Sequence, residues 1–298
     1  MPDKNPAHRF LVKPHTKVHL RGWDTAWAAT EPLRNLKDDE LKQEARETIH
    51  RNLERLSDAQ ELLWASDSHA LLVVLQGMDA SGKDGLLKHV MSGLNPQGCQ
   101  VNSFKQPSDQ ELEHDFLWRY AKSLPPRGRI GIFNRSHYED VLVVRVHPEW
   151  LDKQKLSSKP GHSLWEQRYE DINQFEKHLT RNGTVILKFF LHVSKKEQKR
   201  RLLERLEDPA KHWKFSAADL AERAYWSDYV EAYEDALSAT STKQAPWFII
   251  PADHKWVARL LVSEILTRTI QGLRLKFPEL TKEQRIALAK AKKLLASG

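Results

Sequence analysis

Five short apolar runs, rich in β-branched residues, punctuate the chain after about residue 65. The segments between them have helical composition and are long enough to cross over a sheet. Strands joined by such crossovers run parallel, with helices on both faces. The runs cover residues 70–76, 99–104, 129–134, 184–193 and 246–251. The pattern predicts an α/β fold in which a five-stranded parallel sheet is sandwiched by helices.

Helical periodicity extends beyond this sheet. Asp38 is a candidate N-cap, and the apolar residues that follow it recur every three or four positions, as on one stripe of a helix. The first 35 or so residues lack such a period and are interpreted as an extended arm on the surface or on a neighbouring subunit. We therefore expect an arm and helix over 1–65, a core over 66–275 with a helical lid at about 194–237, and a basic C-terminal helix over 276–298.

A phosphate-binding loop is predicted directly after the first strand. Gly77, Gly82 and Lys83, in "GMDASGKDG", fit the pattern GxxxxGK between an apolar strand and a helical segment. The glycines let backbone N–H groups curl toward phosphate oxygens, and Lys83 adds a full positive charge. A plain glycine turn is the alternative reading. The residues expected to hold phosphate are Gly77, Ala80, Ser81, Gly82, Lys83, Asp84 and Gly85.

Two carboxylates stand in or beside this loop. Asp84 occupies the position where such loops usually place a Ser or Thr hydroxyl, and Asp79 lies inside the loop. Carboxylates repel phosphates unless a divalent cation lies between them, and Mg²⁺ prefers hard oxygen ligands. We therefore expect Asp79 and Asp84 to bind Mg²⁺, with Mn²⁺ as a substitute. Either residue could instead only cap the following helix.

Further candidates follow the other strands. Asn134 and Arg135 end the third run, where a carboxylate is usual in such folds, and they should meet the loop at the carboxyl edge of the sheet. Lys105 and Arg119 follow the second run and could bind the phosphate of an acceptor. Arg201 belongs to a basic lid segment that could close over the phosphates. Ordinary surface positions are the alternative for Lys105, Arg119 and the lid arginines.

The overall charge favours a polyanionic partner. The 298 residues include 47 Lys or Arg against 40 Asp or Glu, which gives a net charge of +7. Cys99 is the only cysteine, so an intramolecular disulfide is impossible and a cytoplasmic location is expected. The chain shows neither a signal peptide nor an apolar run of membrane-spanning length. No membrane partner is expected.

With these motifs assembled, the chain resembles the family-2 polyphosphate kinases. The resemblance rests on "GMDASGKDG" at 77–85, "FKQPS" at 104–108, "HDFLWR" at 114–119, "IFNRSHYEDVLVVRVHP" at 132–148, "RLEDPAKHWKFS" at 205–216, "WSDYVEAYEDAL" at 226–237 and "APWFIIPADHKWVAR" at 245–259. These segments recur in order at matching separations over roughly residues 65–265. The resemblance implies a P-loop kinase fold similar to thymidylate kinase.

The resemblance also implies an activity. Members of the family transfer phosphoryl groups between inorganic polyphosphate and nucleotides, here adenine or also guanine nucleotides. By this resemblance Lys83 binds phosphate in the loop, Asp79 binds Mg²⁺, and Arg135 lies at the phosphoryl group that is transferred. Arg201 and Arg205 lie on the helix that follows the polyphosphate. Many members carry Asp where this chain has Asn134, so that metal role does not transfer. Glu139 in "SHYEDVL" is similar to the branch that acts on both AMP and ADP.

The implied chemistry needs no general base, because a nucleotide phosphate has a second pKa of about 6 and is already ionised at neutral pH. Catalysis reduces to holding two polyanions in line and cancelling their repulsion.

Two other functions remain open from the sequence. An ATP-dependent nucleoside monophosphate kinase of the thymidylate kinase type would share the loop, sheet and lid. A nucleic-acid-binding P-loop protein would suit the basic charge, but the chain has no recognisable nucleic-acid module and no nucleic-acid partner is expected. The apolar stripe of the N-terminal helix is consistent with a homo-oligomer, a dimer or tetramer, and equally with packing inside one subunit.

Overall fold

Five parallel strands form a single sheet in the computed structural model, which describes residues 6–28, 38–156, 161, 163–214 and 216–297. The strands lie in the order β2-β3-β1-β4-β5. Their bounds are β1 (Ala70–Gly77), β2 (Cys99–Ser103), β3 (Ile130–Asn134), β4 (Thr184–His192) and β5 (Trp247–Pro251). Every residue of β1 is buried, as expected for a central strand covered on both faces. The predicted five-stranded parallel sheet is confirmed.

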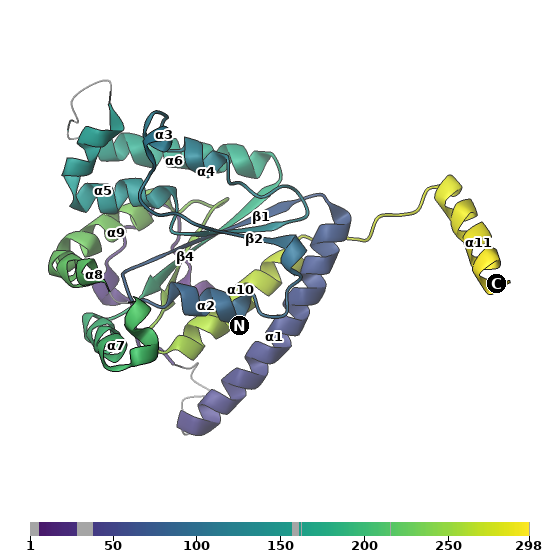
Figure 1. Cartoon of the computed structure of the whole chain (residues 1–298), viewed down its shortest axis with the longest axis horizontal. Coiled ribbons are helices and arrows are strands. Elements are labelled where there is room, and N and C mark those ends of the chain that lie inside the picture. Colours follow the sequence, from purple (N-terminus) through teal and green to yellow (C-terminus); the bar gives the residue numbers. More distant parts are fainter. Residues whose placement is uncertain (1–5, 29–37, 157–160, 162, 215, 298) are drawn as a thin grey trace.

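Helices cover both faces of this sheet. On one face α1 (Asp38–Ser66) packs along α10 (Lys255–Gly272), and α2 (Lys83–Val90) packs beside α10. On the other face α6 (Leu164–Arg181) packs against β4 and α9 (Trp226–Thr240), and α9 contacts α5 (Val143–Val146). Figure 1 shows α6 above the sheet and α1, α2 and α10 below it. Short helices α3 (Asp109–Leu112) and α4 (Trp118–Ala121) follow β2.

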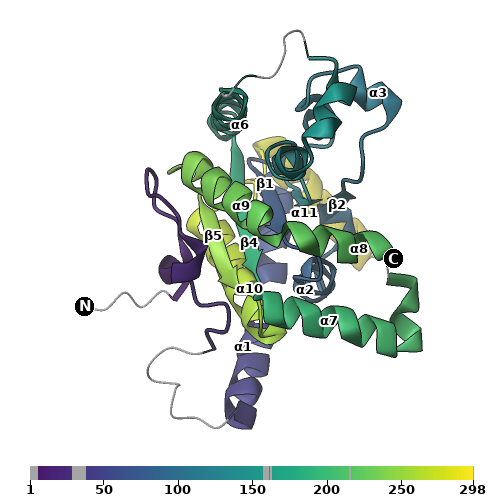
Figure 2. The same ribbon diagram turned by 90° about the vertical axis from the view of Figure 1, so that its left-hand side faces the viewer.

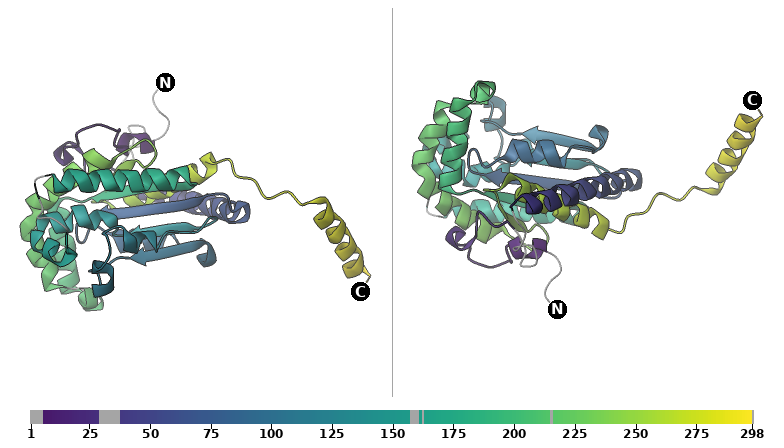
Figure 3. Two further views of the ribbon diagram at one scale, coloured as in Figure 1. Left: turned by 90° about the horizontal axis from the view of Figure 1, so that it is seen from above. Right: turned by 90° about the horizontal axis from the view of Figure 1, so that it is seen from below.

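The segment predicted as a lid is helical. It contains α7 (Lys195–Glu207), the short 3-10 helix η7 (Pro209–Lys214), α8 (Ala217–Glu222) and α9. Figure 2 shows α7 and α8 side by side in front of α2, and Figure 1 places them at one end of the molecule. At the other end α11 (Lys282–Ala296) stands apart from the body, as both views of Figure 3 also show.

The N-terminal arm lies along the outer edge of the sheet. The Val12 amide donates to the Trp247 carbonyl oxygen at 2.9 Å, and Leu11 forms an antiparallel bridge with Phe248. Phe10, Val12 and Val18 are buried there. The arm therefore packs on β5 of its own chain. The part of the arm over 29–37 lies outside the described residues.

A fully buried lysine ties the second helical layer to the sheet. Lys188 on β4 donates to Glu176 at 2.6 Å, to the Tyr138 hydroxyl at 2.9 Å and to the Thr240 carbonyl oxygen at 2.8 Å. Burial lowers the pKa of Lys188, and the Glu176 carboxylate opposes that shift. Because Tyr138 belongs to the turn after β3, this cluster fixes the turn that carries Arg135.

None of the described helices combines the length and the apolar character that crossing a bilayer would take.

Candidate active site

The glycine-rich loop joins β1 to α2 with two residues in left-handed conformations. Ala80 has φ 57° and Gly82 has φ 106°, which lets the chain turn sharply before Lys83 begins the helix. At Gly77 an added Cβ would lie 2.8 Å from Ser81 Oγ and 3.0 Å from the Leu191 carbonyl oxygen. Glycine is therefore required at Gly77 because the loop and β4 approach it so closely.

Lys83 lies against the loop itself. Its Nζ donates to the Gly77 carbonyl oxygen at 2.6 Å and to that of Met78 at 3.2 Å. Burial lowers the pKa of Lys83, while the nearby Asp79 carboxylate opposes the shift. The ammonium group is thus held against the loop carbonyl oxygens, near the position where the sequence predicts a bound phosphate.

Arg201 on α7 holds the glycine-rich loop in place through hydrogen bonds to its backbone. Its guanidinium is buried and donates to the carbonyl oxygens of Ala80 at 3.1 Å and Ser81 at 2.7 Å. The same group donates to the carbonyl oxygens of Ala252 at 2.5 Å and Asp253 at 3.1 Å, in the turn after β5. Carbonyl oxygens that would repel a phosphate are thereby turned toward a cation.

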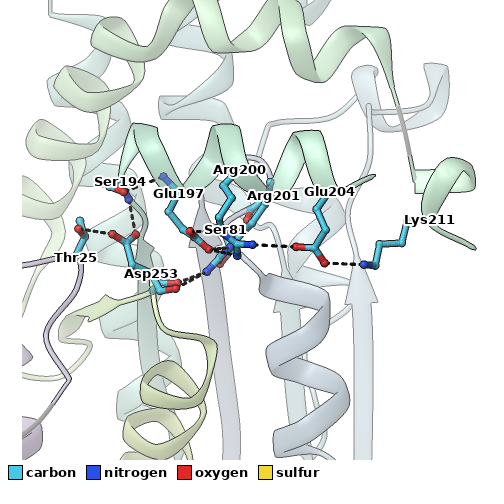
Figure 4. A network of polar contacts seen from close by, with 11 residues as sticks. Thr25, Ser81, Ser194, Glu197, Arg200, Arg201, Glu204, Lys211 and Asp253 are labelled. Carbon is cyan, nitrogen blue, oxygen red and sulfur yellow. Dashed lines mark hydrogen bonds and ion pairs between the residues drawn. The ribbon is translucent and has the colours of Figure 1, made fainter. Parts of the chain in front are cut away.

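Figure 4 shows that the contacts of Arg201 belong to a wider network of hydrogen bonds and ion pairs. Glu197 accepts from Arg201 Nε at 2.7 Å, and Asp253 accepts from the Ser194 amide at 2.7 Å. Thr25 in the N-terminal arm donates its hydroxyl to Asp253 at 2.9 Å. The arm, the start of α7 and the glycine-rich loop are therefore joined by hydrogen bonds.

Arg135 and Asn134 reach the loop from the end of β3. Arg135 has φ 62°, and its guanidinium lies 3.3 Å from Asp79 Oδ1 and 3.8 Å from Glu139 Oε2. Asn134 donates to Asp84 Oδ1 at 3.0 Å. Burial raises the pKa of Glu139, and the charge of Arg135 opposes that shift. The structure thus brings Asp79, Asp84, Asn134 and Arg135 together, as expected for one edge of a parallel sheet.

These residues border a cavity of 650 Å³. The predicted site residues that line it are Asp79, Ala80, Ser81, Gly82, Lys83, Asp84, Gly85, Lys105, Asn134, Arg135, Arg201 and Arg205. Ser81 Oγ and Asn134 Oδ1 are buried here without a hydrogen-bond partner among the described residues. Buried polar atoms are seldom left unpaired, so these two oxygens suit a ligand.

Three predicted residues do not line the cavity. Gly77 is the last residue of β1 and accepts from Lys83 through its carbonyl oxygen, and Glu139 lies 3.8 Å from Arg135. Arg119 is buried, and its guanidinium donates to the Lys105 carbonyl oxygen at 3.0 Å and to the Tyr120 hydroxyl at 2.8 Å. It lies beside a separate hollow of 140 Å³. Arg119 therefore fixes the segment that carries Lys105, and its contact with an acceptor phosphate stays a prediction.

The sequence reasoning missed several residues that line the cavity. Lys255 and Arg259 come from the first turns of α10, and Lys211 comes from η7. Asp219 on α8 accepts from Arg205 at 3.0 Å. Burial raises the pKa of Asp219, and the charge of Asp79 adds to the shift. The signal for Lys255 and Arg259 was the end of the fifth apolar run, because strand ends of a parallel sheet converge on one edge.

The donor atoms at this site fit a hard cation. Asp79 and Asp84 are carboxylates that line one cavity with the unpaired Asn134 Oδ1. Within the described part of the chain there is no group of three His, Cys, Asp or Glu residues that could hold a metal ion. Mg²⁺ commonly takes only one or two protein carboxylates and completes its shell with water and substrate phosphate. The donor set therefore suits Mg²⁺ bound together with a phosphate.

Comparisons with known proteins agree with one another. The family model described as polyphosphate kinase 2 matches residues 37–278. An ADP-polyphosphate phosphotransferase of Rhodopseudomonas palustris is 50% identical over 98% of this chain and 99% of that relative. An AMP/ADP-polyphosphate phosphotransferase of Meiothermus ruber is 49% identical over 91% of this chain and 95% of that relative.

A solved structure extends this likeness to the fold. The crystal structure of polyphosphate kinase 2 from Arthrobacter aurescens TC1 superposes with a TM-score of 0.84 at 40% identity, and it covers 96% of this chain and 97% of that one. These comparisons give no support to an ATP-dependent monophosphate kinase or to a nucleic-acid-binding protein.

Proposed function

The chain belongs to the polyphosphate kinase 2 family and is a phosphotransferase, and from this premise we propose that it moves a phosphoryl group reversibly from inorganic polyphosphate to AMP and to ADP. The products are ADP and ATP, and Mg²⁺ is the expected metal ion. The observation that carries the proposal is one cavity in which the glycine-rich loop faces cations from five other parts of the chain, namely the segments after β2 and β3, and α7, η7 and α10.

The cavity has two sides. We define the donor side as Arg205, Lys211, Lys255 and Arg259, which border the loop toward α7 and α10. We define the acceptor side as Ser103, Phe104, Lys105 and Gln106, which lie at the end of β2 and directly after it. We assign polyphosphate to the donor side, because a chain of phosphates needs several cations along its path. The nucleotide is assigned to the acceptor side, where Phe104 offers an aromatic ring.

The reacting groups meet between these sides. Lys83 and Arg135 neutralise the charge on the transferred group, which passes from one phosphate oxygen to another. Asp79 and Asp84 would hold Mg²⁺, which screens the repulsion between the two phosphates when bound. Arg201 acts indirectly by fixing the loop carbonyls. The nucleotide oxygen attacks as an ionised phosphate, so no side chain has to remove a proton.

The substrate range is proposed on narrower grounds. One relative is named for ADP and the other for AMP and ADP. Glu139 lies 3.8 Å from Arg135, so it can influence how that arginine meets the acceptor. We propose that both AMP and ADP are used, with adenine preferred over guanine nucleotides, by a cytoplasmic homo-oligomer.

The test is a donor assay with AMP and ADP supplied separately, together with Mg²⁺ and long-chain polyphosphate and without ATP. We expect ADP from AMP and ATP from ADP, each detected by anion-exchange chromatography. Omitting polyphosphate is the matched control. A protein that phosphorylates AMP only when ATP replaces polyphosphate would contradict the proposal.

A further inference from the structure

The C-terminal helix is well formed but touches little of its own chain. Thr281 and Gln284 make a capping box at the start of α11, with both reciprocal hydrogen bonds present. Every described side chain from 276 to 297 is exposed. A helix of about 15 residues is marginally stable alone in water. The good cap and the missing tertiary contacts together indicate that α11 packs on something outside its own chain.

The helix has two chemically distinct faces. Apolar residues at spacings of three and four form a stripe, which consists of Ala287, Leu288, Ala291, Leu294 and Leu295. Leu294 is 64% exposed and Leu295 is 84% exposed, so the stripe is uncovered. The remainder of the surface is basic, since α11 carries five Lys or Arg residues and one Glu. Its partner must therefore combine negative charge with some apolar surface.

One long surface of this protein has that character. On α1 a mainly acidic stripe recurs with helical spacing and consists of Glu44, Glu47, Glu54, Asp58 and Glu61, all exposed; Arg51 on the same face pairs with Glu44 at 4.0 Å and leaves the stripe with a net negative charge. Between residues 39 and 66 the helix carries seven acidic and four basic residues. The stripe spans about 25 Å and α11 about 22 Å at 1.5 Å per residue, so the two surfaces match in length. Half-buried Leu62 lies at its border.

The α11 helix does not lie on the α1 helix of its own chain. Figure 1 and the left view of Figure 3 show α11 beyond the end of α1, joined to the body only by the extended segment after α10. We propose that α11 of one chain packs on the acidic stripe of α1 in a second copy of this chain. Two copies that exchange these arms make the same contact twice, which closes the pair with two-fold symmetry.

Charge reversal on either surface tests this pairing. The variant Lys292→Glu/Lys293→Glu reverses charge on α11, and Glu47→Lys/Glu54→Lys reverses it on α1. Mass is measured by light scattering coupled to size exclusion at micromolar protein and at low salt. Wild type should exceed the 34.6 kDa of one chain at least twofold. Each variant alone should lower the mass by about half, and the two combined in one chain should restore it.

Matched controls separate this effect from general changes in charge or folding. Lys177→Glu/Arg181→Glu makes the same charge change on the exposed face of α6 and should leave the mass unchanged. Circular dichroism should show a folded protein for every variant. None of these positions lines the cavity, so the donor assay reports separately on the proposed function.

Three outcomes would overturn the proposal. A wild type that runs at the mass of one chain would exclude exchange. An unchanged mass in both reversal variants would place the oligomer contact elsewhere. Binding of wild type to phosphatidylserine vesicles, lost in the α11 variant while every mass stays the same, would assign the helix to an anionic membrane surface instead.

Discussion

The donor side and the acceptor side of the cavity differ in how densely they are charged. Four cationic residues, from α7, η7 and α10, border the donor side, where Arg205 pairs with Asp219 and Lys211 pairs with Glu204, whereas Lys105, just after β2, is the cation of the acceptor side. Phe104 and Gln106 complete the acceptor side with an aromatic ring and an amide. The contrast matches the two substrates, because a phosphate polymer carries charge along its length and a nucleotide carries it at one end.

The largest effect is expected at the point that both sides share. Lys83→Ala removes the charge that faces both phosphates and should lower phosphoryl transfer about 10²- to 10³-fold with either nucleotide. Asp79→Ala should have a similar effect. Steady-state rates and thermal unfolding measure activity and fold together. Lys88→Ala, on the exposed face of the same helix, is the control and should keep its rate. A normal rate for Lys83→Ala at saturating Mg²⁺ would show that Lys83 does not act on the phosphates of both substrates.

The next largest effect is expected for Arg201, which holds the glycine-rich loop through backbone hydrogen bonds. Arg201→Ala leaves four carbonyl oxygens without their donor and should lower the free energy of unfolding by about 3 kcal/mol or more. The rate should fall about 10²-fold because the loop loses its geometry. Denaturant unfolding and kcat are the measurements. Its neighbour Arg200 is exposed and pairs with Glu197 and Glu204 on the surface of the same helix, so Arg200→Ala should change stability little. Equal losses in the two variants would show that burial of Arg201 is unimportant.

A third variant separates the two sides directly. Lys255→Ala/Arg259→Ala removes two donor-side cations and should raise KM for polyphosphate about tenfold. The KM for AMP or ADP should stay within about twofold, since neither residue borders the acceptor side. Kinetics with short and long polyphosphate, at two salt concentrations, measure the effect. A rise in nucleotide KM without a change for polyphosphate would reverse the assignment of the sides.

A fourth prediction concerns Mg²⁺, which is expected to bind between the donor side and the acceptor side. Asp84→Asn removes one carboxylate next to Asn134 and should raise the Mg²⁺ concentration for half-maximal rate about fivefold. Chelation with EDTA should stop transfer by the wild type, and added Mg²⁺ should restore it. Titration of activity with Mg²⁺ and with Mn²⁺ gives the result. Full activity in excess EDTA would exclude a divalent metal.

The smallest effect is expected at Glu139, which we propose acts on the acceptor through its ion pair with Arg135. Glu139→Gln weakens the ion pair with Arg135 and should change the ratio of rates with ADP and AMP about threefold. The KM for polyphosphate should not change. Parallel assays with the two nucleotides give the ratio, and Glu166→Gln on α6 serves as a distant control. An unchanged ratio would mean that Glu139 does not influence nucleotide choice.

The fold was predictable because its signals are local and repeated. Apolar runs such as 70–76 and 246–251 are flanked by helical segments, and parallel strands need such crossovers. The loop residues were predictable for the same reason, since Gly77, Gly82 and Lys83 lie within seven residues of sequence and their spacing identifies the motif. Strand ends then placed Asn134 and Arg135 beside them.

Side-chain direction was not predictable from the sequence. Arg201 and Arg205 are one helical turn apart on α7, yet Arg201 is buried against the loop carbonyls and Arg205 pairs with Asp219 at the cavity. Arg119 turns toward Tyr120 and the backbone of Lys105. These outcomes depend on contacts between residues up to 121 positions apart, such as that of Arg201 with Ala80, which no periodicity reports.

The pairing of Leu11 and Val12 with β5 has a consequence for handling the protein. A strand at the edge of a sheet exposes backbone groups that readily pair with another chain, and here the arm occupies part of that edge. Shortened versions that begin after residue 12 would bare Trp247 and Phe248 on β5. Such truncated proteins should aggregate when concentrated, so truncations made for crystallisation should keep residues 11 and 12.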